Sequence, residues 1–341
     1  MNIAFFTKEL PSNAPNGVSC QAHRLANSLV TLGHTVTCFS FSGKPIDALY
    51  SHRQLFRKAH HKISSLFEAG LVFASMQTAG YDIVHFHGDD YFVKGSTNRV
   101  RTFYGSAIFE ARFEHDFMRK MRQALFYILE WVSCFRQGTK VGISRSTVQA
   151  LPLVKNVVHC GVPLGLFTPG RTKSPFPSIL FIGDLDSRKR GSLLIKAFQT
   201  VVLPAMPDAV LTIIGPQECN GLNIVCKKNV DQEELINHFR QSWVYCCPSS
   251  YEGFGVPLCE AMACGTAVVA CENKTVSEII THEHDGLVCS KAALGEALVL
   301  LLGNARVRAK FVDNGLETVK QYDAKKIAEQ YLNLYEKIAV K

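Results

Sequence analysis

The sequence predicts an α/β protein that consists of two doubly wound, Rossmann-like domains. Short apolar runs alternate with helical patterns along the whole chain, as expected for parallel sheets whose faces are covered by helices. The length of 341 residues exceeds what a single hydrophobic core usually supports. With 47% hydrophobic and 19% charged residues, the composition is that of an ordinary globular protein.

Twelve strands are expected, six in each half of the chain. In the first half they are Ile3–Phe6, Thr35–Phe39, Asp82–Phe86, Val100–Phe103, Lys140–Ile143 and Asn156–His159. In the second half they are Ser178–Ile182, Ala209–Ile214, Leu222–Cys226, Trp243–Cys247, Thr266–Ala270 and Gly286–Val288.

The domain boundary is expected where proline and glycine accumulate. The stretch from Gly161 to Pro177 contains four prolines and three glycines, which is typical of a linker. We therefore assign residues 1–165 to the first domain and residues 166–323 to the second. A last helical pattern covers residues 324–341.

Several classes of protein are excluded by composition. The chain has no run of eighteen apolar residues, so we expect no membrane-spanning helix. The first eight residues indicate a buried strand rather than a signal peptide. The twelve cysteines include no Cys-x-x-Cys pair, so we expect neither a zinc site nor a disulfide framework, and a cytoplasmic location.

Positive charge is concentrated in the first domain. Residues 1–165 contain 18 lysine and arginine residues against 10 acidic ones, whereas the remainder is neutral. The basic and apolar block at residues 51–63 suits an amphipathic helix on an anionic membrane surface; the alternative is a solvated helix face. Residues 113–135 are expected to form a core helix rather than a second anchor. Nucleic acid is not an expected partner, because no recognition motif is present.

The most informative segment is residues 249–265, in which Glu252 and Glu260 are separated by seven residues. Gly253, Phe254 and Gly255 form a turn between them, and Val256 leads into a helix with Pro257 expected at its first position. A helix N-terminus binds anions, and carboxylates bind sugar hydroxyls. The segment therefore indicates a site for a nucleotide-sugar, although a capped helix with two solvated glutamates is the alternative.

Three further strand ends carry polar side chains. After the strand Ser178–Ile182, the loop from Gly183 contains Arg188 and Lys189, which suits a diphosphate. Near the N-terminus, Gly17 and Val18 lie in a turn before a helix expected to begin near Ser19. The alternative to a binding role is a solvated charge cluster for the loop with Arg188 and Lys189, and a Ser-capped turn for the segment at Gly17 and Val18.

The third strand end, after Asp82–Phe86, carries two histidines. His85 and His87 alternate there, so they share one face of the strand. Tyr104 follows the next strand and suits a hydrogen bond or stacking on a sugar ring. The alternative for His87 is a purely structural role.

Together these motifs resemble the GT-B-fold retaining glycosyltransferases of family 4, also called glycosyl transferases group 1. The segment from Glu252 to Gly265 resembles their Glu-x7-Glu signature, and Lys189 matches the lysine of their donor-diphosphate loop. Three positions depart from the family pattern: Asp184 stands where the loop has Arg, Asn16 replaces a Gly, and Tyr104 replaces a His near the acceptor.

The resemblance implies a role for each motif. Arg188 and Lys189 neutralise the leaving diphosphate, while Glu252 holds sugar hydroxyls near the reacting carbon. Donor contacts fall to Gly17, Gly183, Gly215, Gly253, Phe254, Gly255, Val256 and Glu260, and acceptor contacts to His87 and Tyr104.

The resemblance also implies an overall reaction. A hexosyl group moves with retention from a UDP- or GDP-sugar to the hydroxyl of a glycolipid, polysaccharide or small molecule, without a metal or other cofactor. The two domains face each other across a cleft, and the last helix crosses back to the first domain. Two other functions stay open: a non-catalytic nucleotide-sugar-binding scaffold subunit and an NDP-sugar epimerase of the same fold.

Overall fold

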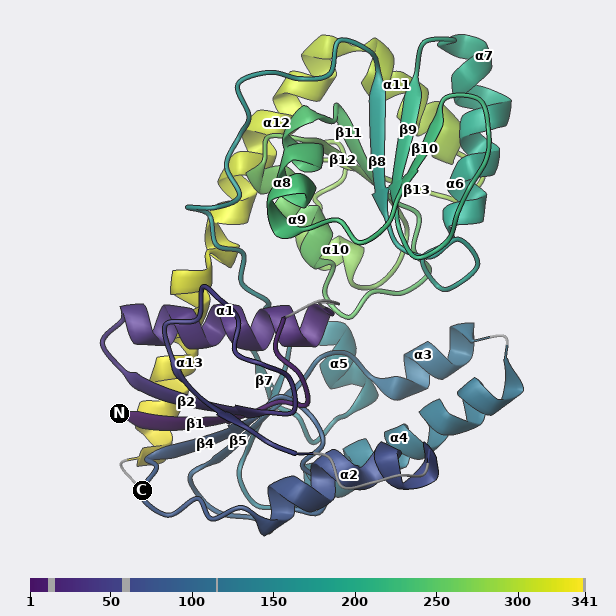
Figure 1. The fold of residues 1–341 in the computed structure, drawn as a ribbon. Helices are drawn as coiled ribbons and strands as arrows, with labels where there is room; N and C mark the ends of the chain where they lie inside the picture. Colours follow the sequence, from purple (N-terminus) through teal and green to yellow (C-terminus); the bar gives the residue numbers. More distant parts are fainter. Residues whose placement is uncertain (12–15, 57–61, 115, 340–341) are drawn as a thin grey trace. The chain divides into compact units, whose positions relative to one another are not determined.

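The structure, a computed structural model, describes residues 1–11, 16–56, 62–114 and 116–339 (Figure 1). It divides into two compact units. Unit 1 contains Met1–Ala111, Met118–Gly161 and Asp323–Lys341, and unit 2 contains Arg112–Phe117 and Val162–Tyr322. The long central division thus falls at Gly161, at the start of the expected linker.

Unit 1 is built on a seven-stranded parallel sheet with the order β3-β2-β1-β4-β5-β6-β7. Its strands are β1 (Asn2–Phe6), β2 (Thr35–Ser40), β3 (Ser51–Gln54), β4 (Ile83–Phe86), β5 (Arg99–Phe103), β6 (Thr139–Gly142) and β7 (Asn156–Val157). Its helices are α1 (Gly17–Thr31), α2 (Lys62–Ser75), α3 (Ala107–Phe113), α4 (Phe117–Phe135), α5 (Arg145–Ala150) and α13 (Ala324–Ala339).

Alternation along β1 distributes the core of unit 1 over both faces of its sheet. Ile3 and Phe5 pack with apolar residues of α1 and α13, whereas Ala4 and Phe6 pack with those of α2. Successive side chains of a strand point to opposite faces, so an apolar run without polar interruptions requires helices on both. Unit 1 is therefore doubly wound.

The C-terminal helix α13 is bound to the sheet of unit 1 by buried polar contacts as well as by packing. It lies alongside α1 (Figure 1). The Tyr335 hydroxyl lies 2.6 Å from His85 Nδ1, and the Tyr331 hydroxyl lies 2.9 Å from Thr102 Oγ1. Thr102 Oγ1 in turn lies 2.8 Å from His85 Nε2. Both ring nitrogens of this buried histidine are thus satisfied, as burial of polar groups requires.

Unit 2 is built on a six-stranded parallel sheet with the order β10-β9-β8-β11-β12-β13. Its strands are β8 (Ser178–Ile182), β9 (Val210–Ile214), β10 (Ile224–Lys227), β11 (Val244–Cys247), β12 (Ala267–Cys271) and β13 (Leu287–Cys289). Its helices are α6 (Gly191–Ala197), the π-helical η1 (Phe198–Val202), α7 (Leu203–Ala205), α8 (Gln232–Gln241), α9 (Val256–Ala263), α10 (Val276–Ile279), α11 (Leu294–Gly303), α12 (Ala305–Val319) and the 3-10 turn η2 (Lys320–Tyr322).

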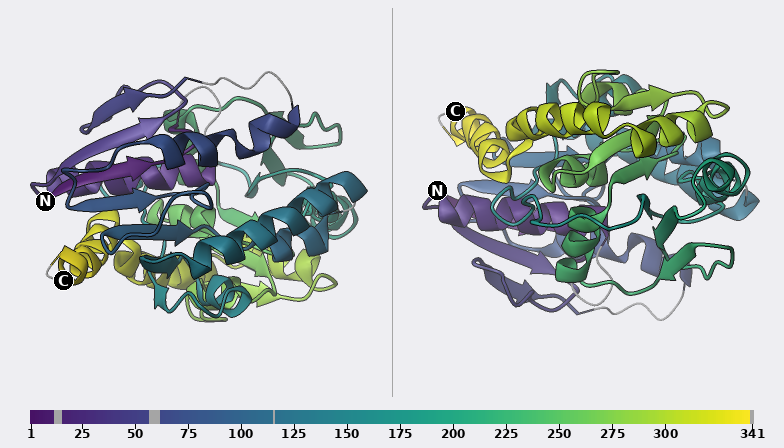
Figure 2. Two further views of the ribbon diagram at one scale, coloured as in Figure 1. Left: turned by 90° about the horizontal axis from the view of Figure 1, so that it is seen from below. Right: turned by 90° about the horizontal axis from the view of Figure 1, so that it is seen from above.

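The main core of unit 2 joins its strands to α6, η1, α11 and α12. The helices α11 and α12 are the yellow-green pair seen most clearly from above (Figure 2). Leu194, Phe198, Leu298 and Leu301 are fully buried in this core. The strands are mostly apolar because residues on both of their faces are buried.

In each sheet the strand order reverses between two neighbouring strands, β1 and β4 in unit 1 and β8 and β11 in unit 2. Ligands of doubly wound sheets bind beyond the carboxyl ends of the strands at such a switch point. The loops that follow these four strands are therefore where binding residues are expected.

The predicted fold class is confirmed, and each of the twelve predicted strands corresponds to an observed one. The strand β3 was not predicted. Its residues Ser51–Gln54 belong to the block for which an amphipathic helix was expected, and that expectation is wrong for them: they pair with β2 as an edge strand. Residues 57–61 of the block lie outside the described residues.

The expectation of a core helix at residues 113–135 is also wrong. Helix α4 buries Leu129, Ser133 and Cys134, but it exposes Phe117, Met118, Met121, Leu125, Ile128 and Phe135. A helical pattern of apolar residues shows that one face is apolar but not that something covers it, which is why the sequence misled here.

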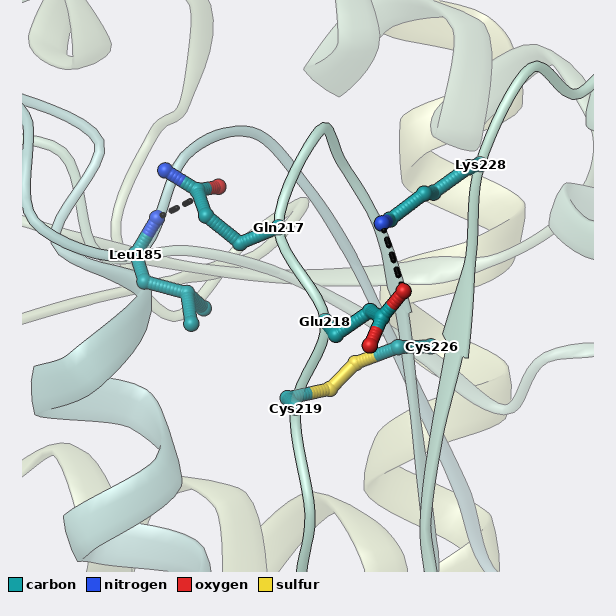
Figure 3. The surroundings of a disulfide bond; sticks show 6 residues. All are labelled: Leu185, Gln217, Glu218, Cys219, Cys226 and Lys228. Carbon is teal, nitrogen blue, oxygen red and sulfur yellow. Dashed lines mark hydrogen bonds and ion pairs between the residues drawn. A yellow bond between two sulfur atoms is a disulfide. The ribbon is translucent and has the colours of Figure 1, made fainter.

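No disulfide framework was expected, but the structure contains a disulfide between Cys219 and Cys226, with a Cα–Cα distance of 5.9 Å (Figure 3). Cys219 lies in the segment after β9, and Cys226 lies in β10 itself. The chain turns back between them because β10 pairs with β9, so residues seven apart in sequence meet. Within the described residues, no helix combines the length and the hydropathy needed to cross a bilayer.

The buried network of α13 yields a first prediction. Tyr335→Phe removes the hydroxyl that bonds His85 and leaves a buried ring nitrogen without a partner, which costs roughly 1–3 kcal/mol. We expect urea unfolding monitored by circular dichroism to show this loss. Tyr81→Phe, at a half-buried tyrosine that packs edge-on against Phe39, is the matched control and should change stability little. Equal stability of the two variants would contradict the assigned role of this bond.

Candidate functional site

At the switch point of unit 2, three charged side chains from two loops meet. Glu252 follows β11, and Arg188 and Lys189 follow β8. Lys189 Nζ lies 2.8 Å and 3.0 Å from the two carboxylate oxygens of Glu252, and Arg188 Nη1 lies 3.2 Å from Oε2. The three residues that the sequence assigned to catalysis therefore form one cluster.

The carboxylate of Glu252 is ionised because of its two cations. The residue is only 5% exposed. Burial alone raises the pKa of Glu252, but Lys189 and Arg188 more than offset this and lower it to about 2. With one carboxylate and two cations, the cluster has a net charge of about +1, which suits the approach of an anion.

Further hydrogen bonds fix the two loops to each other. Arg188 Nη1 donates to the carbonyl of Tyr251 at 2.8 Å, and the amide of Ser250 donates to the carbonyl of Arg188 at 2.8 Å. On the other side, Thr275 Oγ1 donates to the carbonyl of Glu252 at 2.7 Å. The cluster is therefore held by the backbone on both sides rather than by side chains alone.

Two glycines make room for this cluster. Gly183 has φ +149°, and a Cβ there would lie 2.8 Å from Cγ of Lys189, so a larger residue would displace the lysine. At Gly215 a Cβ would lie 2.4 Å from the carbonyl oxygen of Gly183. Both glycines were predicted as donor-binding residues, and the structure places them together at the ends of β8 and β9.

Helix α9 begins directly after the loop that carries Glu252. Gly255, at φ +100°, is the N-cap and Val256 the first helical residue, so Pro257 is second rather than first as predicted. Because the cap is a glycine, no side-chain oxygen occupies this helix end, and Gly253 precedes it in the turn.

Two of the predicted donor-binding residues, Phe254 and Glu260, have buried side chains. Phe254 is 2% exposed and packs edge-on against Tyr322 at 5.3 Å, so its ring belongs to the interior of unit 2. Glu260 lies in α9 and is 5% exposed. The ring of Phe254 thus packs in the core, and its assignment as a donor-binding residue stays a prediction.

The switch point of unit 1 holds a pocket of about 320 Å³, here called the unit 1 pocket. Its lining includes His87, Arg101, Tyr104, Ser106, Glu110, Gln123, Glu130 and the start of α1 at Asn16, Val18 and Ser19. Helix α1 begins at Gly17 rather than near Ser19: Asn16 is its N-cap, and Ser19 completes a capping box.

The two predicted acceptor residues are hydrogen-bonded to each other. His87 Nδ1 lies 2.8 Å from the hydroxyl of Tyr104, and both side chains line the unit 1 pocket. Burial, with a smaller contribution from Arg101, lowers the pKa of His87 to about 3, so the ring is neutral. Burial also raises the pKa of the Tyr104 hydroxyl, which therefore keeps its proton.

Sequence reasoning missed Arg101, Asp90 and Glu130. Arg101 lies on β5 and lines the pocket, while Glu130 of α4 accepts from Ser106 Oγ at 2.9 Å and from the Ala107 amide at 3.0 Å. Burial raises the pKa of Glu130 to about 7. Two arginines beside Val100 in a strand expected to be buried were the available signal, because buried arginines are rare unless paired.

The structure thus brings the predicted residues together in two groups, one in each unit. Gly17, His87 and Tyr104 belong to unit 1, and the remaining predicted residues belong to unit 2. Within the described ranges, no group of three or more His, Cys, Asp or Glu side chains is arranged to hold a metal ion.

Comparisons with known proteins agree with this organisation. Residues 169–318 match the family described as "Glycosyl transferases group 1". The phosphatidyl-myo-inositol mannosyltransferase of Mycobacterium leprae is 31% identical over 175 residues, which cover 48% of this chain and 47% of that protein. The chain therefore spans about half the length of the curated relatives it matches.

Solved structures match over nearly the whole chain. Sucrose-phosphate synthase of Thermosynechococcus elongatus superposes with a TM-score of 0.79 at 20% identity, covering 99% of this chain and 98% of that one. Alr3699/HepE of Anabaena, solved in complex with UDP-glucose, superposes with a TM-score of 0.74 at 15% identity, covering 99% and 100%. At these identities the likeness shows the fold.

The ion cluster predicts how stability depends on pH. Because the pKa of Glu252 is lower in the folded protein than its ordinary value of 4.5, its contribution is present above pH 4.5 and is lost as the pH falls towards about 2. In Glu252→Gln the free energy of unfolding should change less between pH 5 and pH 3, by roughly 2 kcal/mol. Urea unfolding at pH 5 and at pH 3 measures the difference. Glu233→Gln, at an exposed position of α8, is the control and should follow the parent protein.

Proposed function

Because residues 169–318 belong to glycosyl transferases group 1 and the chain has the GT-B fold, we propose that the protein is a retaining glycosyltransferase of family 4. It moves a hexosyl group from a nucleoside diphosphate sugar to an acceptor hydroxyl. The observation that carries the proposal is the cluster of Glu252, Lys189 and Arg188 beside the N-terminus of α9.

The donor diphosphate binds between these cations and the start of α9. Lys189 and Arg188 stabilise the negative charge that develops as the bond from the anomeric carbon to the diphosphate breaks. They supply this charge without a metal ion. Binding of the anion weakens their pairing with Glu252, which then accepts hydrogen bonds from sugar hydroxyls, while Glu260 accepts from the ribose.

The acceptor hydroxyl attacks the anomeric carbon on the face that the diphosphate leaves. Its oxygen forms the new glycosidic bond, and its proton passes to the leaving diphosphate oxygen. His87 and Tyr104, in the unit 1 pocket, position the acceptor. A UDP-sugar is the first donor to test, since a protein of this fold was solved with UDP-glucose.

We also propose that α4 docks on an anionic membrane surface. Met118, Met121, Leu125 and Ile128 follow one another at intervals of three or four residues on one exposed face. Arg119, Lys120 and Arg122 are exposed beside them, and residues 1–165 hold the whole positive excess of the chain. An apolar stripe bordered by basic residues suits acidic headgroups.

The enzymatic proposal predicts that Lys189→Ala and Glu252→Ala each lower the rate of donor turnover about a hundredfold or more. Release of nucleotide from UDP- and GDP-sugars, with and without candidate acceptors, measures this rate. Lys196→Ala and Glu233→Ala, at exposed positions of α6 and α8, are matched controls that should keep the parent rate. Unchanged turnover in both site variants would exclude the proposal. Donor binding without turnover in the parent protein would favour a non-catalytic subunit.

The docking proposal predicts that the double variant Met121→Ser, Leu125→Ser loses most of its binding to vesicles that contain phosphatidylglycerol. Two apolar contacts with the lipid are then removed, while the charge is unchanged. Co-sedimentation measures the bound fraction, and Leu222→Ser, at an exposed position of unit 2, is the control. Equal binding of the variant and the parent protein, or no binding of either, would contradict this role of α4.

A further inference from the structure

The disulfide between Cys219 and Cys226 ties residues 216–220, here called the β9–β10 segment, to strand β10 (Figure 3). Both cysteines are half-buried and pack against the main core of unit 2. A neighbouring ion pair joins the same two stretches, with Lys228 Nζ 3.0 Å from Glu218 Oε1. Both side chains of this pair are exposed to solvent, so it holds the segment only weakly. The disulfide is therefore the main link between the segment and β10.

The backbone of the β9–β10 segment contributes little to holding it in place. Within the described part of the chain, residues 216–220 take part in no backbone–backbone hydrogen bond. Such bonds occur on either side: the amide of Gly215 donates to the carbonyl of Lys227 at 3.1 Å, and that of Ile224 donates to the carbonyl of Gly221 at 3.3 Å. A stretch with few backbone hydrogen bonds opens at a low cost in free energy. The covalent link therefore determines how far this stretch can move.

The β9–β10 segment also contacts residues 183–190, here called the cation loop because it holds the two cations of the candidate site. Gln217 Oε1 accepts from the amide of Leu185 at 3.4 Å (Figure 3). Gly215, directly before the segment, lies so close to Gly183 that a Cβ on it would be 2.4 Å from the carbonyl oxygen of Gly183. A shift of the segment is thus transmitted to the cation loop by a hydrogen bond and a close backbone contact.

Thiol–disulfide exchange can open and re-form this bond. A thiolate of an external dithiol attacks one sulfur, and the other cysteine leaves as a thiolate. The second thiol of the reductant then attacks the mixed disulfide, which releases the remaining cysteine and converts the dithiol into a cyclic disulfide. Two electrons pass to the protein, and the two protons of the dithiol end on Cys219 and Cys226. Because both cysteines are only half-buried, a small dithiol can approach them.

We propose that Cys219 and Cys226 form a redox-sensitive tie that sets the affinity of unit 2 for a nucleoside diphosphate. As a disulfide they hold the β9–β10 segment against the cation loop, so that Arg188 and Lys189 are preorganised for the anion. As two thiols they release the segment, and the cation loop has to be ordered when the anion binds. The oxidised form therefore binds nucleoside diphosphates more tightly than the reduced form. The proposal rests on the proposed function, because it regulates the same donor site.

The test is calorimetric titration of the full chain with UDP and with GDP, after oxidation by oxidised glutathione and after reduction by dithiothreitol. We expect the oxidised form to bind at least one nucleotide about fivefold or more tightly than the reduced form. The double variant Cys219→Ser, Cys226→Ser should bind as weakly as the reduced parent protein under both conditions. Cys20→Ser, at a half-buried cysteine of α1, is the matched control and should keep the redox response of the parent protein.

Three results would overturn the proposal. The first is equal nucleotide affinity of the oxidised and the reduced parent protein. The second is a redox response that survives in the double cysteine variant. The third is the absence of a bond between Cys219 and Cys226 from peptide mass spectra of the protein treated with oxidised glutathione.

A second variant separates this role from a purely stabilising one. Gln217 carries the effect to Leu185, so Gln217→Ala should lose most of the difference in nucleotide affinity between the two redox states. Its midpoint of urea unfolding should still fall on reduction, because the disulfide is unchanged. Gln232→Ala, at an exposed position of α8, is the control and should keep the difference in affinity. A full redox response of the affinity in Gln217→Ala would contradict the link between the segment and the cation loop.

The proposed function and this inference can fail separately. Hydrogen exchange of residues 183–190, measured without a ligand, should be faster after reduction in the parent protein but equal under both conditions in the double cysteine variant. If neither nucleotide binds in either redox state while this exchange responds to reduction, the donor-site assignment fails and the tie stands as a contact between the two loops. If a nucleotide binds equally in both states and the exchange is unchanged, the transferase proposal stands and the redox-sensitive tie fails.

Discussion

The buried carboxylate of Glu252 is the constraint on which the arrangement of unit 2 depends. At 5% exposure it stays ionised only because Lys189 and Arg188 contact it. Lys189 reaches it because Gly183 has no Cβ, and Gly183 can take its place because Gly215 leaves room for its carbonyl. The ionised carboxylate of Glu252 thus depends on the backbone at Gly183 and Gly215, at the ends of β8 and β9. This arrangement makes the site rigid before any ligand binds.

In both units one buried carboxylate contacts two cations near the switch point of the sheet. Each unit places polar side chains beyond the strands where the order of a parallel sheet reverses, since only there do adjacent loops diverge to leave space. In unit 2 the anion Glu252 lies between the two cations Arg188 and Lys189 and contacts both. In unit 1 the buried carboxylate of Asp90 pairs with both Arg99 and Arg101.

The sequence was sufficient to predict an element of the structure where the local residue pattern and the chemistry of the side chains indicate the same element. Apolar runs bounded by turns located the strands, and the segment around Glu252 located the loop and the helix that follow β11, because both features are contiguous in sequence. The sequence was insufficient where contacts with a distant part of the chain determine the local structure. The edge strand Ser51–Gln54 has no apolar alternation, and it is a strand only because β2 pairs with it. Likewise, the pairing of His87 with Tyr104 and of Arg101 with Asp90 depends on strand neighbours that spacing alone does not specify.

The departure of this chain from the family pattern at Asp184 can be explained in the same terms. Asp184 Oδ2 accepts from Ser187 Oγ at 3.3 Å, and its carbonyl accepts from the amide of Gly191, so the residue shapes the turn before α6. An arginine there would add a cation, but Arg188 already contributes one through its contacts with Glu252 and the carbonyl of Tyr251. We infer that the positive charge expected at the first position has moved four residues along the same loop. Because a diphosphate responds to charge and geometry rather than to sequence position, this exchange is compatible with donor binding.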